Sequence, residues 1–537
     1  MKNKIYKIFL LSGVSLLSLS CVNDLEQVPE DGRVTVEQQF ANKPFDTYQA
    51  LNAKLYTQLS LAGQGGPNGE TTDASDLQGF DGGKSNYFRV LWSTQELITD
   101  EAKNSWEGDA GMIELSSADI NSSNDVLKNF FYRIFTCIAK DNEFLREAAD
   151  SKIESRNLTE DQKKEVKYYR AEARFLRALH YYHAIDNFGN VPFIDESDLP
   201  GIKAPRVKSR AEIFSFIESE LKEIIPLLRP AKSVYGRADK ASAGMLLAKL
   251  YLNAGVYTGT TRYADCKKAL DDYVLTAGYT IDTNFADTFK GDNNLSTEII
   301  FPIISDPAHA QSYGNVSYLI NAAGIGKTDG IDLQPAFYLG SSGQWGGNKT
   351  TKEFISLFSP GDKRAMFDKR DGLIEFITDL SKDRQGYRIT KFTNIRRNGT
   401  YIAGGSDSNF VDTDFPLFRL SDAYLMAAEC AINGAGSLDA TVLGNLNKLR
   451  QRAGMPTVTA AAVNSKFLID ERGRELYWEA HRRQDLIRFG MLAGSQYVWN
   501  WKGSVNGSAL PNTINLYPIP FDQLVMNPNL KQNPGYN

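Results

Sequence analysis

Histidine and cysteine are scarce in this chain, with four of each among 537 residues. So few histidines argue against a His-rich metal centre. Cys137, Cys266 and Cys430 each fall in a helix-like pattern, so the sequence predicts buried free thiols instead of a disulfide framework. After the N-terminal leader, no stretch approaches the ~20 consecutive apolar residues of a membrane-spanning helix. The net charge of −5 gives no strong attraction to nucleic acid.

Motifs for catalysis are absent as well. Gly326-Lys327-Thr328 imitates the end of a phosphate loop, but position 321, where such a loop needs glycine, is Asn321. His180 and His183 stand three apart without a third ligand at metal-site spacing, so we expect both rings inside a helical packing face. No nucleophile motif occurs, and no local sequence nominates the two carboxylates of a glycosidase. We therefore expect a protein that is not an enzyme.

One turn is a candidate site for a metal ion. Asp292 and Glu298 lie in a Gly/Asn-rich stretch, and carboxylate oxygens are ligands that calcium prefers. The alternative is a solvated turn. The sequence thus predicts no cofactor. Calcium is the one ion for which these two residues are candidate ligands.

The N-terminus has the layout of a bacterial lipoprotein leader. Three lysines within the first seven residues precede an apolar run at residues 8–19, and Cys21 follows. This run is too short, and wrongly flanked, for a spanning helix. The box before the cysteine is relaxed, since Ser18 stands where leucine is usual, and the alternative is an ordinary cleaved signal. We predict a signal peptide at residues 1–20 and lipid on Cys21, so that acyl chains tether the mature protein to a membrane.

Helices dominate the apolar pattern. Residues 163–187 predict one long helix ended by Gly189, and Ser209 begins the next, with Glu212 completing a capping box. The other predicted helices cover residues 238–254, 263–273, 420–432, 438–449 and 470–489, and short β-like runs lie at 299–301 and 376–377. The fold class is therefore mainly α. The succession of helices with short connectors favours stacked antiparallel hairpins, as in tetratricopeptide arrays, although no clean repeat of fixed period is present.

Long loop-rich stretches separate these helical blocks. We place the helical scaffold mainly at residues 122–276 and 418–490 and the loop-rich region mainly at residues 63–115 and 278–414. Binding residues tend to lie on loops that a rigid scaffold holds in place. We therefore expect the binding site in the loop-rich region.

Three aromatic residues of the loops stand out. Trp106, Tyr313 and Trp345 each sit in a polar, glycine-rich context and not on an apolar helix stripe. Sugar rings have an apolar C–H face that stacks on an aromatic ring, and a rim of hydroxyls that needs polar partners. These residues therefore predict a carbohydrate platform. The alternative is that the three rings pack back onto the core, as we expect for Trp478.

Six segments, in order along the mature chain, resemble the SusD/RagB family of outer-membrane glycan-binding lipoproteins. They are residues 171–193, 236–259, 415–429, 446–456, 471–490 and 517–536. The resemblance implies one SusD-like domain at residues 21–537, with tetratricopeptide-like hairpins that face a SusC-like TonB-dependent transporter. It also implies a lipid-anchored protein on the outer face of the outer membrane. This protein binds a neutral oligo- or polysaccharide, delivers it to that transporter and has no catalytic activity.

The resemblance also implies roles for single residues, because the likeness is greatest to the starch-binding founder of the family. Tyr313 and Trp345 fall on two positions of its aromatic arc, and Asp109 falls on a hydrogen-bonding asparagine. Asn104 stands at the third arc position and is counted among the carbohydrate-binding residues, and Trp106 is expected to take over the stacking there. An α-glucan is the first expectation for the ligand. A fructan, a β-glucan or xyloglucan, or a peptide or glycopeptide cargo without glycan binding remain alternatives.

Overall fold

The computed structural model describes residues 35–67, 75–199, 201, 204–328, 330–335, 338–401 and 409–536. The predicted leader and Cys21 lie outside these described residues. Among the described helices, none is long and apolar enough to cross a membrane.

Helices carry most of the regular structure. Those before the irregular middle region are α2 (Val36–Asn42), α3 (Pro44–Thr57), α4 (Tyr87–Glu96), α5 (Met112–Ser117), α6 (Asp125–Glu147), α7 (Asp150–Ser155), α8 (Glu160–Phe188), α9 (Arg210–Ile224), α10 (Lys240–Leu252), α11 (Ala254–Thr258) and α12 (Tyr263–Tyr273). Those that follow are α13 (Val316–Ala323), α14 (Lys352–Ile355), α15 (Leu420–Ile432), α16 (Ala440–Arg452), α17 (Ser465–Leu476), α18 (Arg482–Arg488) and α19 (Phe521–Met526).

The strands are short and form two-stranded antiparallel pairs. They are β1 (Val191–Phe193) with β2 (Arg206–Lys208), β3 (Ile299–Ile303) with β8 (Phe415–Arg419), β4 (Lys327–Thr328) with β5 (Ile331–Asp332), and β6 (Phe367–Asp368) with β7 (Arg388–Ile389). The predicted run at 299–301 is confirmed as part of β3, whereas the run at 376–377 is not a strand. There, Ile377 pairs its backbone with the Asn500 side chain instead of with a neighbouring strand.

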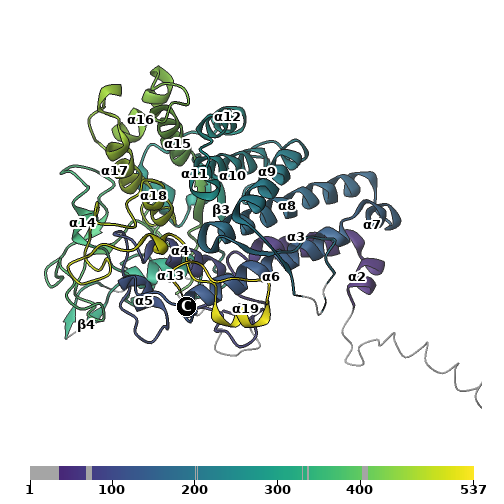
Figure 1. Ribbon diagram of the computed structural model, residues 1–537, viewed down its shortest axis with the longest axis horizontal. Helices are drawn as coiled ribbons and strands as arrows, with labels where there is room; N and C mark the ends of the chain where they lie inside the picture. The colour runs from purple at the N-terminus through teal and green to yellow at the C-terminus, as the bar shows by residue number, and fades with distance from the viewer. Residues whose placement is uncertain are drawn as a thin grey trace, which may run out of the picture.

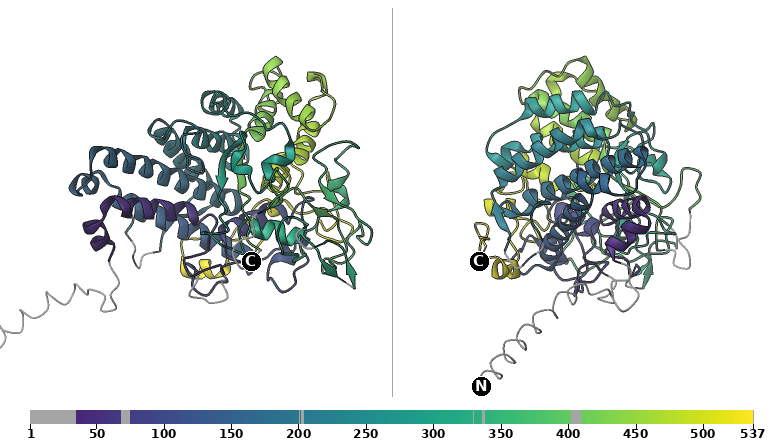
Figure 2. Two further views of the ribbon diagram at one scale, coloured as in Figure 1. Left: turned by 180° about the vertical axis from the view of Figure 1, so that it is seen from behind. Right: turned by 90° about the vertical axis from the view of Figure 1, so that its right-hand side faces the viewer.

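The long helices stack side by side in one array (Figure 1). Neighbours in the array are α6 and α8, α8 and α9, α10 and α12, and then α12 and α15, which also contacts α16 and α17. The helical blocks from the two halves of the sequence are therefore continuous in space. The irregular middle region, which contains α13, α14 and β4, gathers at one end of the array. The view from behind shows it at the same end of the molecule (Figure 2). The predicted mainly α class with stacked hairpins is confirmed.

Local sequence explains where the principal helices begin and how closely they pack. Thr159 and Gln162 form a capping box at the start of α8, and Ser209 and Glu212 form the predicted one at the start of α9. Gly244 lets α10 and α12 approach, because a Cβ added there would lie 2.3 Å from the Cβ of Tyr273. A small residue at this point is thus a condition of the stacking.

The prediction of a single helix at 470–489 is wrong, because the chain breaks between α17 and α18. Trp478 and Ala480 both have φ of 61° at the break. Two buried carboxylates accept from its backbone: Trp478 N–H donates to Glu101 Oε2 at 2.9 Å, and His481 N–H to Glu96 Oε1 at 3.2 Å. The Trp478 indole is fully buried in the core, as expected. Tertiary hydrogen bonds therefore override the helical pattern here.

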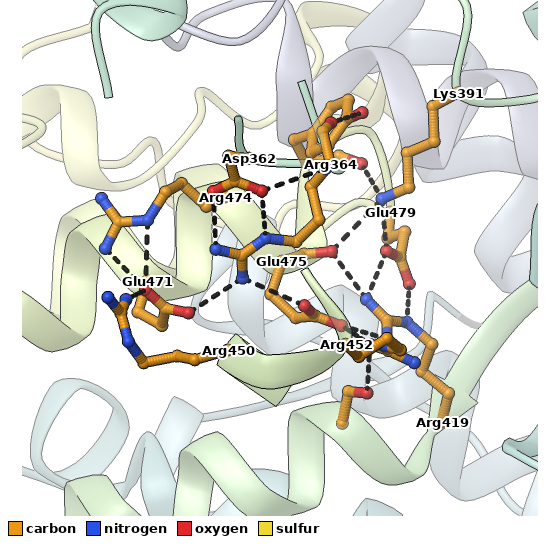
Figure 3. A network of polar contacts seen from close by, with 12 residues as sticks. Asp362, Arg364, Lys391, Arg419, Arg450, Arg452, Glu471, Arg474, Glu475 and Glu479 are labelled. Carbon is orange, nitrogen blue, oxygen red and sulfur yellow. Dashed lines mark hydrogen bonds and ion pairs between the residues drawn. The ribbon is translucent and has the colours of Figure 1, made fainter. Parts of the chain in front are cut away.

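A buried network of ion pairs fastens the middle region to α17 (Figure 3). Glu475 accepts from Arg419 Nη1 at 2.8 Å and from Arg364 Nη1 at 3.2 Å, and it also pairs with Arg452. The other labelled members are Asp362, Lys391, Arg450, Glu471, Arg474 and Glu479. Burial alone would raise the pKa of Glu475, but these three guanidinium groups hold it far below its usual value. Glu475 is therefore a charged group in the interior.

Glu298 belongs to the same interior. It is fully buried and accepts from Arg419 Nη1 at 2.6 Å and from Arg452 Nη1 at 2.5 Å. The expectation of a solvated turn is therefore wrong for this residue, and its carboxylate is committed to two cations of the protein. Among the described residues, no group of three His, Cys, Asp or Glu side chains is arranged to hold a metal ion.

The histidines and cysteines of the array lie in its core. His180 Nδ1 bonds Asp141 Oδ2 at 2.8 Å, and His183 Nδ1 lies 2.6 Å from the Tyr87 hydroxyl. Burial lowers the pKa of His183 to about 3, so its ring is neutral. The three predicted free thiols, at Cys137, Cys266 and Cys430, are confirmed as buried.

Candidate functional site

Backbone pairing between two distant loops builds the candidate site. Lys103 and Lys349 exchange backbone hydrogen bonds of 2.8 and 3.0 Å, and Ser105 N–H donates to the Gly347 carbonyl at 3.1 Å. Trp345 N–H donates in turn to the carbonyl of Asn321, at the end of α13, at 3.0 Å. This short ladder places Trp106 beside Trp345, although 239 residues separate them in sequence.

Trp106, Trp345 and Tyr313 form a row of rings, which we call the aromatic arc. The ring centroids of Tyr313 and Trp345 lie 5.9 Å apart with the planes at 55°. Those of Trp345 and Trp106 lie 6.4 Å apart at 45°. Each ring plane is thus tilted relative to the next ring in the row. The structure therefore brings together the three aromatic residues that the sequence singled out.

Glycine permits the closest contact of the arc. Gly347 has φ of 102°, and a Cβ added there would lie 2.5 Å from Cε2 of the Trp106 ring. The indole thus lies against bare backbone, a contact that any other residue would prevent. The glycine-rich stretch around Trp345 is explained by this packing.

Trp345 and Tyr313 are also held by a neighbouring loop. The Trp345 Nε1–H donates to Asn409 Oδ1 at 3.1 Å, and Tyr313 packs against the buried ring of Phe410, 4.9 Å away. Trp106 and Trp345 are partly buried against the core. Packing onto the core, the alternative to a platform, accounts for part of each surface. All three rings remain partly exposed, which leaves area for a ligand.

Asp109 stands next to the arc as a charged acceptor. Its carboxylate lies 2.9 Å from Lys84 Nζ and also pairs with Arg89. Burial alone would raise its pKa, but the charges of Arg89 and Lys84 hold the pKa of Asp109 below its usual value. Arg89 in turn lies over the Trp106 ring, with 5.4 Å to its centroid, and so connects the acid to the arc.

Asn104 has a different place from the one expected. It is fully buried, its Nδ2–H donates to Asn348 Oδ1 at 2.7 Å, and its Oδ1 accepts from Trp106 N–H at 2.8 Å. Both ends of the amide are used inside the protein, so it faces no ligand. Asn104 supports the loop that presents Trp106, and we leave it out of the proposed contact residues.

Sequence reasoning missed the residues that hold the arc. Arg89, Asn409 and Phe410 contact its rings, and Lys84 pairs with the neighbouring Asp109. No local motif marks any of them. A pattern within one segment cannot reveal them, because each contact joins segments far apart in the chain.

Two family models match the chain. The one described as "SusD family" matches residues 378–536, and the one described as "Starch-binding associating with outer membrane" matches residues 83–252. Starch-binding protein SusD of Bacteroides thetaiotaomicron is 34% identical, with 100% of both chains covered. SusD-like protein P2 of Formosa agariphila is 23% identical, with 99% of this chain and 100% of the relative covered.

Solved structures have the same fold. A SusD superfamily protein from Bacteroides thetaiotaomicron matches with a TM-score of 0.69 at 18% identity, covering 91% of this chain and 99% of its own. A laminarin-binding SusD-like protein matches with a TM-score of 0.67 at 20% identity and the same coverage. Full-length similarity to SusD at this level of identity, together with the shared helical fold, shows that the chain belongs to the SusD family.

Proposed function

We propose that this protein binds a neutral oligo- or polysaccharide at the aromatic arc. Trp106, Trp345 and Tyr313 stack on the apolar faces of successive sugar rings. Asp109, which is ionised, accepts hydrogen bonds from sugar hydroxyls. The observation that carries the proposal is the row itself, with neighbouring centroids 5.9 and 6.4 Å apart and tilted planes.

The proposed ligand is an α-glucan, because a row of tilted rings suits a curved chain better than a flat ribbon. The relative of 34% identity is named a starch-binding protein, which supports the same choice. Fructans and β-linked glucans stay as alternatives, and the structural neighbours named for laminarin make a β-glucan the first of them. A peptide or glycopeptide cargo is the last alternative.

The proposed location is the outer face of the outer membrane. Lipid on Cys21 would tether the mature chain there, and a partner transporter of the SusC type would receive the glycan. The proposed role is capture and delivery without catalysis. A Cys21→Ala variant of the full chain is expected in the soluble fraction, and its retention in the membrane fraction would refute the anchor.

Native affinity gels test the ligand. The protein from Val22 onward is run through gels that contain starch, pullulan, dextran, levan, inulin, xyloglucan or laminarin. We expect retardation by starch and pullulan and none by the fructans. Trp345→Ala is expected to lose about 2 kcal/mol of binding, roughly thirtyfold in affinity, as for an interface hot spot.

A matched control separates the arc from exposed aromatics in general. Phe521 on α19 is 60% exposed and lies outside the arc, so Phe521→Ala is expected to bind like the unaltered protein. Equal retardation of the Trp345→Ala and unaltered proteins would refute the site. If no polysaccharide retards the protein, glycan binding is refuted in favour of the peptide-cargo alternative.

A further inference from the structure

A cavity opens between α3, α8 and β3, and none of the three arc rings lines it. Its volume is 370 Å³, at the lower end of the range for small-molecule sites. Three tyrosines line it, Tyr56, Tyr169 and Tyr235. Tyr235 is 42% exposed. Its hydroxyl donates to Asp414 Oδ2 at 2.7 Å, so the ring is fixed while one part of it faces outward.

A buried acceptor lies in the wall of this cavity. Asn52 is 4% exposed, and its Nδ2–H donates to Glu172 Oε2 at 3.4 Å. Its Oδ1 has no donor among the described residues. The amide cannot be turned over, because its oxygen would then face the Glu172 carboxylate, which accepts two hydrogen bonds from Arg237. The oxygen is enclosed within the wall, and its burial without a donor costs free energy, so a ligand hydroxyl would satisfy it after a small movement of the wall.

Charge in the cavity is balanced, which selects a neutral ligand. Arg237 is the one lining cation, and its Nη2 lies 2.6 Å from Glu172 Oε1. Its guanidinium also lies over the Tyr169 ring, 4.6 Å from the centroid. No unpaired cation is therefore presented to an anion. The partly exposed Tyr235 side chain and the Asn52 acceptor of the same cavity repeat the chemistry that we propose for the arc.

A short segment of chain joins the cavity to the arc. Ala310 lines the cavity and Tyr313 belongs to the arc, and three extended residues span at most roughly 11 Å. Asn86 holds the two together, since its Nδ2 donates to the Ser60 carbonyl at 2.6 Å and to Ser312 Oγ at 3.1 Å. Ser60 is itself a lining residue of the cavity. The two places therefore lie within the length of one oligosaccharide.

We infer that this cavity is a second sugar subsite, which takes a unit of the same neutral glycan beyond the Tyr313 end of the arc. The inference rests on the proposed function. Its consequence is a dependence on chain length: a short oligosaccharide engages the arc alone, while a longer one gains the second subsite at a high effective concentration.

A blocking variant tests this inference. Ala310→Trp fills the cavity from its rim, and Ala308→Trp is the matched control, because Ala308 is exposed in the same turn and does not line the cavity. Titration calorimetry is run with maltotriose and maltoheptaose, and with laminaritriose and laminarihexaose as a second series. We expect Ala310→Trp to weaken binding of the longer chain about tenfold and that of the trisaccharide by less than about twofold. Ala308→Trp is expected to bind all of them as the unaltered protein does.

Three outcomes would overturn the inference. An unchanged affinity of Ala310→Trp for the longer chain would show that the cavity takes no sugar. An equal loss for both chain lengths would show that the substitution disturbs the arc, and a loss in Ala308→Trp would show an effect of the turn. The proposed function fails separately, if the unaltered protein binds neither series and no polysaccharide of the affinity gels retards it.

Discussion

The buried network around α17 and the aromatic arc invert the usual places of charged and apolar side chains. Arg364, Arg419 and Glu475 carry full charges at 1% exposure or less, while Trp106 and Trp345 keep part of their rings in solvent. The charged groups are tolerated inside because each finds an opposite charge at hydrogen-bond distance. The rings stay at the surface because loop backbone holds them there. Whether a side chain is buried here thus depends more on its partners than on its polarity.

Removing one partner from the buried network should give the largest effect. Glu475→Ala removes one negative charge that Arg364, Arg419 and Arg452 share. The three arginines keep their remaining acidic partners, so the interior is left with an excess of positive charge. We expect the free energy of unfolding to fall by about 3–5 kcal/mol. Urea denaturation measures this loss.

An exposed pair on the same helix is the control for that change. Lys466 and Asp470 form an i,i+4 pair on α17, and the lysine side chain is 64% exposed. Lys466→Ala should cost less than about 0.5 kcal/mol, because solvent screens such pairs. If both substitutions cost the same, burial of the charges would not be what makes the network important.

The free energy of unfolding should depend on pH through two buried glutamates, whereas the glycan affinity of the arc should not. Burial raises the pKa of Glu101 to about 8, and burial together with the charge of Glu101 raises that of Glu96 well above its usual value. The folded protein therefore holds protons on this pair that the unfolded chain releases near pH 4.5. The contribution is complete below that pH and is lost as the pH rises toward 8.

The variant Glu101→Gln isolates this contribution. It keeps an oxygen acceptor for the Trp478 N–H but has no proton to lose. Unfolding measured from pH 4.5 to 8 should show a decline in the unaltered protein, relative to the variant, of at least about 1 kcal/mol. Parallel curves for the two proteins would exclude the pair as the source. Glycan affinity of both should stay level over the same range, since Asp109 remains ionised.

The smallest expected effect is at the edge of the arc. Asp109→Asn keeps an oxygen acceptor and removes the charge that pairs with Lys84 and Arg89. We expect glycan affinity to fall about three- to tenfold, as for the loss of one charge-assisted hydrogen bond. Calorimetry measures it, and Lys84→Ala, which leaves the Arg89 pair in place, is expected to change affinity by less than about twofold. An unchanged affinity in Asp109→Asn would remove this acid from the site.

Much of the scaffold was predictable because its signals are local. The capping box at Ser209 and Glu212, the small residue at Gly244 and the apolar stripes each act within a few turns of helix. The single helix predicted at 470–489 failed for the opposite reason. Its break is fixed by Glu96 and Glu101, which lie far away in sequence.

The arc shows the same division. Trp106, Tyr313 and Trp345 could be selected from the sequence, because large rings in polar, glycine-rich loops have no local reason to be there. The role of Asn104 could not be assigned from the sequence, because only the fold shows that its amide bonds Asn348 and the Trp106 backbone.

The sequence by itself determined the family, the helical class and the identity of the three rings. Composition, helix periodicity and motif order are properties of neighbours along the chain, so they survive without coordinates. The tertiary structure alone decided that the rings form one row, that Glu298 and Glu475 are buried with arginines, and that a cavity lies beside Tyr313. Each of these depends on contacts between segments that are far apart in the chain, and such contacts arise only when packing of the whole core brings the segments together.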